Sequence, residues 1–160
     1  MNLDNARQMG NKKSMRIMGL DVGTHTVGMA ISDELGLTAQ GLKTLGRKSM
    51  EEDFKEIAAI IHQFGIEEIV VGLPKNMNGT LGKQAEFVLK WIEVLKDNIQ
   101  VPVVTWDERL STVGATRVLL EADLSRGKRK KVIDKLAAVL ILQGYLDQRR
   151  RPNHGPLSEE

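Results

Sequence analysis

The order of apolar segments along the chain constrains the fold more than any other feature of the sequence. Three short apolar runs, at 15–22, 27–32 and 37–45, follow one another with only turns between them. Runs of this length and spacing are typical of strands joined as hairpins. We therefore expect the first three strands of the fold to pair antiparallel.

Further along, segments with helical periodicity alternate with short apolar runs. Ser49 can cap a helix, with Glu52 three residues later as in a capping box, and apolar residues then recur at helical spacing. Apolar runs follow at 68–72 and 101–106, with a second helical pattern between them. Strands that are separated by helices pair in parallel through crossovers. The order predicts an α/β fold with a mixed five-stranded sheet and helices on both faces.

The last third of the chain contains two more helical patterns, at 111–122 and 132–148, on either side of a basic segment. We expect the segment between them, 123–130, to be a loop. The two ends of the chain are polar and lack periodicity. The chain is thereby divided into a disordered N-terminal extension (1–14), one folded domain (15–149) and a polar C-terminal tail (150–160).

The composition excludes several classes of protein. The 160 residues suit one domain and contain no cysteine, which excludes disulfides and cysteine-based metal or nucleophile sites. No apolar stretch approaches the roughly 20 residues of a membrane span, and the N-terminus lacks an apolar signal core. We therefore expect a cytoplasmic protein with no membrane partner. The net charge is only +2, but five of the six residues 126–131 are basic.

The first candidate for chemistry is Asp21, which closes the first predicted strand and precedes a turn that contains Gly23 and Thr24. An acid at a strand end can hold a metal, while a threonine hydroxyl or the N–H groups of a glycine turn can meet phosphate oxygens. The alternative is a plain hairpin in which the carboxylate of Asp21 caps the turn. The motif alone leaves both interpretations open.

Two adjacent acids, Asp107 and Glu108, follow the strand at 101–106. Because side chains alternate along a strand, only one of the two can point into a shared site. Spacing does not choose between them. Arg109 can contact a phosphate, or it can neutralise whichever acid is left over.

The third acid, Asp134, follows the basic residues Lys128, Arg129, Lys130 and Lys131. Asp134 is either a member of the site or an ordinary first-turn residue that the helix dipole favours. The four basic residues either hold a phosphate backbone or are simply solvated.

The loop at 73–82 is rich in proline, asparagine and glycine, and it contains Lys75 and Asn76. It either lines the same cleft or only connects a strand to a helix. Because the carboxyl ends of parallel strands meet at one edge, Asp21, this loop and Glu108 are expected to lie together.

These segments closely resemble, in the same order, the YqgF family of Holliday-junction-resolvase-like proteins, which are regarded as candidate nucleases of pre-16S ribosomal RNA. The resemblance covers about 15–149 and implies a ribonuclease-H-like fold. It also implies that Asp21, Glu108 and Asp134 form an acidic triad, with Glu108 chosen over Asp107. The matching motifs are DVGTHTVGMAISD (21–33), VGLPKNMNG (71–79), DERLST (107–112) and the basic stretch before Asp134.

The resemblance implies a metal-dependent nuclease that hydrolyses phosphodiester bonds, in the 5′-end maturation of pre-16S rRNA during ribosome biogenesis. The triad would hold one or two Mg²⁺ or Mn²⁺ ions, since hard cations prefer oxygen ligands. The alternatives are a Holliday junction resolvase in DNA recombination and repair, and a non-catalytic RNA-binding regulator. The partner is then precursor rRNA or branched DNA, and the protein is a monomer or a homodimer. The substrate contacts that we expect are Thr24, Lys75, Asn76, Arg109, Lys128, Arg129, Lys130 and Lys131.

Overall fold

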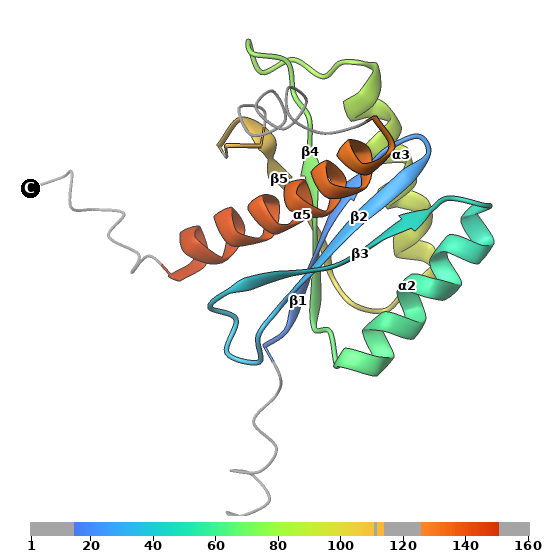
Figure 1. Cartoon of the computed structure of the whole chain (residues 1–160), viewed down its shortest axis with the longest axis vertical. Helices are drawn as coiled ribbons and strands as arrows, with labels where there is room; N and C mark the ends of the chain where they lie inside the picture. Colours follow the sequence, from blue (N-terminus) through green and yellow to red (C-terminus); the bar gives the residue numbers. More distant parts are fainter. Residues whose placement is uncertain (1–14, 111, 114–125, 151–160) are drawn as a thin grey trace, which may run out of the picture.

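The computed structural model of the protein describes residues 15–110, 112–113 and 126–150, the last segment with side chains from 132 onward. It contains one five-stranded sheet in the order β3-β2-β1-β4-β5, so that β1 is central (Figure 1). β2 pairs antiparallel with both β1 and β3, whereas β1, β4 and β5 run parallel, which confirms the predicted mixed sheet. The strands are β1 (Ile17–Val22), β2 (Thr26–Ser32), β3 (Ala39–Gly46), β4 (Glu68–Leu73) and β5 (Val103–Asp107).

Helices cover both faces of this sheet, as predicted (Figure 1). α2 and α3 lie on one face, called here the α2/α3 face, and α5 crosses the opposite one, called the α5 face. None of the described helices is long and apolar enough to cross a membrane. The helical elements are α2 (Met50–Phe64), α3 (Lys83–Asn98), the short 3-10 helix η1 (Glu108–Leu110) and α5 (Arg126–Arg150).

Some of the predicted elements lie outside the described residues. These are the N-terminal extension, most of the helix expected at 111–122 and the C-terminal tail beyond Arg150. The predicted cap of α2 is confirmed, because the Ser49 hydroxyl accepts a hydrogen bond from the Glu52 N–H at 3.2 Å. The helix ends at Gly65, whose φ of 63° is the left-handed conformation that glycine adopts without strain.

Alternation along the strands sends different side chains to the two faces. In β1, Met18 and Leu20 are fully buried in the core that α2 and α3 cover. Ile17 belongs instead to the smaller apolar cluster beneath α5. Gly19 also faces α5, since a side chain there would come within 2.7 Å of the Cβ atom of Leu142. α5 therefore lies unusually close to the backbone of the central strand.

The start of α5 corrects the prediction for the basic segment. We expected a loop at 123–130 and a helix from 132. Residues 123–125 lie outside the described part of the chain, but residues 126–130 are helical and belong to α5 (Arg126–Arg150). Lysine and arginine are good helix formers, and among residues 126–131 only Gly127 opposes a helix. Asp134 is consequently the ninth residue of α5, counted from Arg126, and the first turn contains no acid. The helix dipole, which acts within the first turn, does not explain its presence.

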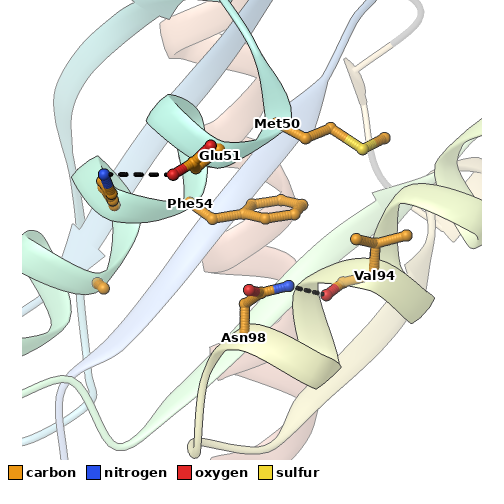
Figure 2. Close-up of a pocket in the computed structure, with 7 residues that line it drawn as sticks. Met50, Glu51, Phe54, Val94 and Asn98 are labelled. Atoms are coloured by element: carbon orange, nitrogen blue, oxygen red, sulfur yellow. Dashed lines mark hydrogen bonds and ion pairs between the residues drawn. The ribbon is translucent and has the colours of Figure 1, made fainter.

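A pocket of about 450 Å³ lies between α2 and α3, lined in part by Met50, Phe54 and Val94 (Figure 2). Its polar groups already have partners in the structure: Glu51 pairs with Lys55 at 3.4 Å, and the Asn98 amide donates to the Val94 carbonyl at 2.8 Å. The pocket is on the α2/α3 face, so the sheet separates it from the residues that face α5.

Candidate active site

Three neighbouring strands place Asp21, Gly28 and Gly72 in one row near the carboxyl end of β1. Asp21 pairs with Gly28 of β2, and Gly72 of β4 follows the pair Leu20–Val71 by one residue. Neighbours of this kind point to the same face of a sheet, about 5 Å apart. This face is the α5 face, because a side chain at Gly72 would meet Ile141 of α5 at 2.4 Å. We call the three residues the edge row.

Asp134 lies over one end of the edge row. A side chain at Gly28 would come within 2.0 Å of the Asp134 carbonyl oxygen, so glycine is required for α5 to lie this close. Asp134 is half-buried, and the Thr26 hydroxyl donates a hydrogen bond to its Oδ2 atom. The contact brings α5 to β2 across 108 residues of sequence. Asp134 thus stands one strand away from Asp21.

Glu108 lies at the other end of the edge row. Its Oε1 atom is 2.8 Å from the position that a Cβ atom would occupy at Gly72. Asp107 points elsewhere, because its carboxylate binds Arg109 through Nε at 3.1 Å and Nη2 at 2.7 Å. Of the two acids between which sequence spacing did not choose, Glu108 thus lies against the edge row, whereas Asp107 is bound to Arg109.

Arg109 neutralises the spare acid, which is one of the two roles considered for it. The hydrogen bond from its guanidinium holds the pKa of Asp107 below the ordinary value of 3.8, and the charge of Lys75 acts in the same direction. The same hydrogen bond raises the pKa of Arg109. Its Nη1 atom also donates to the Met77 carbonyl at 3.3 Å. Arg109 therefore joins the end of β5 to the loop after β4.

The loop after β4 is braced internally. The Asn76 N–H donates to the Thr80 carbonyl at 3.0 Å, and the Asn76 side chain donates to the Thr80 hydroxyl at 3.0 Å. Gly79 completes the turn with a φ of 86°, which favours glycine. Lys75 is half-buried and Asn76 exposed. The loop forms a fixed rim beside Glu108, because Arg109 ties it there.

Thr24 is exposed at the tip of the β1–β2 turn, and it lines a pocket of about 300 Å³ together with Arg47 and Lys48. Sequence analysis missed these two cations, although a basic pair directly before the cap of α2 was visible. For Lys128, Arg129, Lys130 and Lys131 the structure places the backbone in the first two turns of α5, and their side chains lie outside the described part of the chain.

The donor set suits a hard divalent cation by its chemistry. Asp21, Glu108 and Asp134 offer only carboxylate oxygens, and the glycines of the edge row let Asp134 and Glu108 come close to the strands on either side of Asp21. Within residues 15–110, 112–113 and 126–150, however, no three acidic or histidine side chains stand close enough together to hold one ion as they are. Only 9% of Asp21 is exposed, so the site is set into the protein rather than spread on its surface.

Comparison with known proteins identifies the family. The RuvX family, described as Holliday junction resolvase, matches this chain over residues 15–148. The chain belongs to the RuvX family. RuvX and YqgF are two names for this family, so the resemblance drawn from the four sequence motifs is confirmed.

Relatives of this RuvX chain are similar over nearly their whole length. A protein of Desulforamulus reducens named "Putative pre-16S rRNA nuclease" is 61% identical over 133 residues, which cover 83% of this chain and 97% of the relative. A Clostridium acetobutylicum protein of the same name is 59% identical over 133 residues, covering 83% of this chain and 98% of the relative.

Among solved structures, Thermus thermophilus RuvC in complex with a Holliday junction substrate resembles the RuvX chain with a TM-score of 0.54. The identity is 16%, and the match covers 85% of this chain and 97% of RuvC. At this identity the likeness shows the fold alone. Together with the strand order, it confirms the predicted ribonuclease-H-like, resolvase-type fold.

Proposed function

We propose that this protein is a metal-dependent nuclease that hydrolyses phosphodiester bonds during 5′-end maturation of pre-16S rRNA in the cytoplasm. The names of its close relatives support the substrate. The observation that carries the chemistry is the position of Glu108 and Asp134 at opposite ends of the edge row, with Asp21 between them. Folding alone does not require three acids from β1, η1 and α5 to lie along one row of the sheet.

In this proposal Asp21, Glu108 and Asp134 hold one or two Mg²⁺ or Mn²⁺ ions. Three carboxylates repel one another, and a cation between them offsets that cost. When bound, the cation activates a water molecule and stabilises the charge that develops on the leaving oxygen. Asp21 sits on a central strand and Glu108 beside a braced loop, so both are fixed before the substrate arrives.

The nucleic-acid backbone is proposed to run along the rim of this site. We assign contacts with phosphate oxygens to Thr24 of the β1–β2 turn and to Lys75 and Asn76 of the rim. Arg109 contributes positive charge while it remains bound to Asp107. Contacts of this kind hold a backbone without reading its sequence. We assign the remaining backbone contacts to Lys128, Arg129, Lys130 and Lys131.

A cleavage assay tests the proposal directly. Precursor 16S rRNA with a 5′ extension, four-way junction DNA and an unrelated single-stranded RNA are incubated with the protein, with and without Mn²⁺. We expect metal-dependent shortening of the precursor at its 5′ end. Asp21→Asn should lower the rate by about 1000-fold, a loss of ~4 kcal/mol of transition-state stabilisation, and leave the melting temperature unchanged.

Asp33→Asn is the matched control, because Asp33 is a turn acid between β2 and β3 that accepts the Leu37 N–H at 2.7 Å. It should cleave as the wild type does. Full activity in Asp21→Asn would reject the assignment of the site. Tight binding of the precursor without any cleavage by the wild type would instead establish a non-catalytic RNA-binding regulator.

A second candidate is a junction resolvase, which the family description and the RuvC-like fold favour. Paired cuts at symmetric positions of the four-way junction would support it, and they would require two sites that face opposite arms in a dimer. The ratio of kcat/KM for the junction and for the precursor rRNA decides between the two substrates.

The basic segment has its own test. Replacing Lys128, Arg129, Lys130 and Lys131 by glutamine keeps good helix formers in α5. If all four contact phosphates of a single strand, the slope of log affinity against log salt concentration should fall by about 3. An unchanged slope would remove these residues from the proposed interface.

A further inference from the structure

We propose that Thr26 is a positioning residue, whose hydroxyl fixes the carboxylate of Asp134 in the orientation that the acidic site needs. The inference rests on the proposed function, because it assigns a task inside that same site. Thr26 lies inside the motif DVGTHTVGMAISD (21–33), but neither the motif nor the family resemblance gave it this role.

The contact itself is specific. The Thr26 Oγ1 atom donates to Oδ2 of Asp134, and both residues are half-buried. Hydrogen bonds to an ionised carboxylate are roughly twice as strong as those between neutral groups. The bond engages one oxygen of the carboxylate, and so it sets the direction in which the other oxygen points.

The backbone of Asp134 is placed by a different contact. Gly28, two residues after Thr26 on the same face of β2, receives the Asp134 carbonyl at close range. The contact between Gly28 and the Asp134 carbonyl fixes where α5 lies, but it leaves the side-chain torsions of Asp134 free. The terminal torsion of an aspartate is broad. Of the described contacts, only the Thr26 hydroxyl restricts it. Gly28 therefore places the backbone of Asp134, and Thr26 orients its side chain.

Thr26 is itself held rigidly. Its carbonyl accepts the Gly23 N–H at 2.8 Å, which closes the β1–β2 turn. Arg47 holds the same turn through two hydrogen bonds. Its Nη1 atom donates to the Gly23 carbonyl at 2.9 Å, and its backbone N–H donates to the His25 carbonyl at 2.9 Å. The guanidinium is anchored in turn by Asp53, at 3.5 Å, of which only 2% is exposed. The hydroxyl therefore meets Asp134 from a preformed position.

A partner that orients a metal ligand contributes to metal affinity without touching the ion. Removing such a partner typically costs about 10–100-fold in affinity or activity. A loss of this kind differs from a loss of folding, because it appears in metal binding when the protein is fully folded. It also differs from a loss of substrate binding, because it should leave KM for the nucleic acid little changed.

The test compares Thr26→Val, which removes the hydroxyl and keeps the shape, with Thr26→Ser, which keeps the hydroxyl. Mn²⁺ binding is measured by calorimetry without nucleic acid, and kcat and KM are measured on the substrate that the wild type cleaves. We expect Thr26→Val to bind Mn²⁺ about 10-fold more weakly and to lose kcat by a similar factor, with KM little changed. Thr26→Ser should remain close to the wild type.

Thr105→Val is the control, because it makes the same change at an exposed position of β5. Wild-type Mn²⁺ affinity and kcat in Thr26→Val would overturn the role of Thr26 alone. Equal losses in Thr26→Val and Thr26→Ser would overturn it as well, since they would trace the effect to the methyl group. A wild type that neither binds Mn²⁺ nor cleaves would contradict the proposed nuclease and, with it, any positioning role.

Discussion

The two faces of the sheet differ sharply, although the same strands build both. Met18 and Leu20 of β1 are fully buried against the helices of the α2/α3 face, where Trp91 is fully buried as well. On the α5 face the same strand presents Gly19 and Asp21, and the neighbouring strands add further glycines. One face is filled with large apolar side chains, and the other is opened for a close helix and for carboxylates.

The difference indicates that stability and chemistry are divided between the faces. Burying carboxylates and replacing large side chains by glycine both cost folding free energy. The apolar α2/α3 face offsets this cost, because each large side chain buried there contributes about 1.5–3 kcal/mol. The alternation of side chains along a strand makes the division possible within a few residues. Substitutions on the two faces should therefore have separable effects.

The largest expected effect is on cleavage, at Glu108. Glu108→Gln keeps the size of the side chain and removes the charge at the end of the edge row. We expect kcat/KM to fall by about 1000-fold, which corresponds to ~4 kcal/mol. The free energy of unfolding, measured with urea, should change little, since Glu108 is only half-buried.

Asp107→Asn is the adjacent control. It weakens the contact with Arg109 and loosens the rim, so a loss of activity below about tenfold is expected, ~1.4 kcal/mol at most. If Asp107→Asn were as inactive as Glu108→Gln, the geometric choice between the two acids would be wrong.

The next effect is on stability, at Leu20. This side chain is fully buried on the α2/α3 face, so Leu20→Ala should lower the free energy of unfolding by about 3 kcal/mol. Cleavage per folded molecule, assayed well below the melting temperature, should stay at the wild-type rate. A fall in kcat beyond the unfolded fraction would show that the α2/α3 face also shapes the site.

Gly28→Ala should affect both properties. The new methyl group would meet the Asp134 carbonyl, which lies 2.0 Å from the Cβ position, so α5 must move away. We expect a loss of about 2 kcal/mol in stability, as for other overpacked sites, together with a loss of cleavage because Asp134 moves. Gly46→Ala is the control, since nothing lies within 4 Å of that position. Equal effects of the two substitutions would mean that the close approach of α5 is not what matters.

Much of this division could be predicted from the sequence, and some of it could not. The strand order followed from apolar runs and turn glycines, which act locally, and Asp21 was placed at the correct edge for the same reason. The start of α5 was misplaced because residues 126–131, five basic residues and one glycine, resemble a solvated loop. The contact between Thr26 and Asp134 joins segments 108 residues apart. No local pattern signals such a pair, and only the packing of α5 on β2 creates it.

The smallest expected effect concerns pH, and it sharpens the contrast between Glu108 and Asp107. The hydrogen bond from Arg109 lowers the pKa of Asp107 below its ordinary 3.8. A carboxylate with a lowered pKa stabilises the folded protein above the unfolded-state value, and this contribution is lost as the pH falls below 3.8 towards the folded-state pKa. The pair is partly exposed, with 34% of the Arg109 side chain accessible, so solvent screening keeps the contribution small. The difference in unfolding free energy between the wild type and Asp107→Asn should therefore be largest near neutral pH and shrink below pH 4. A difference that stayed constant with pH would mean that Asp107 acts through its shape rather than its charge, and the rim would then be held by the loop alone.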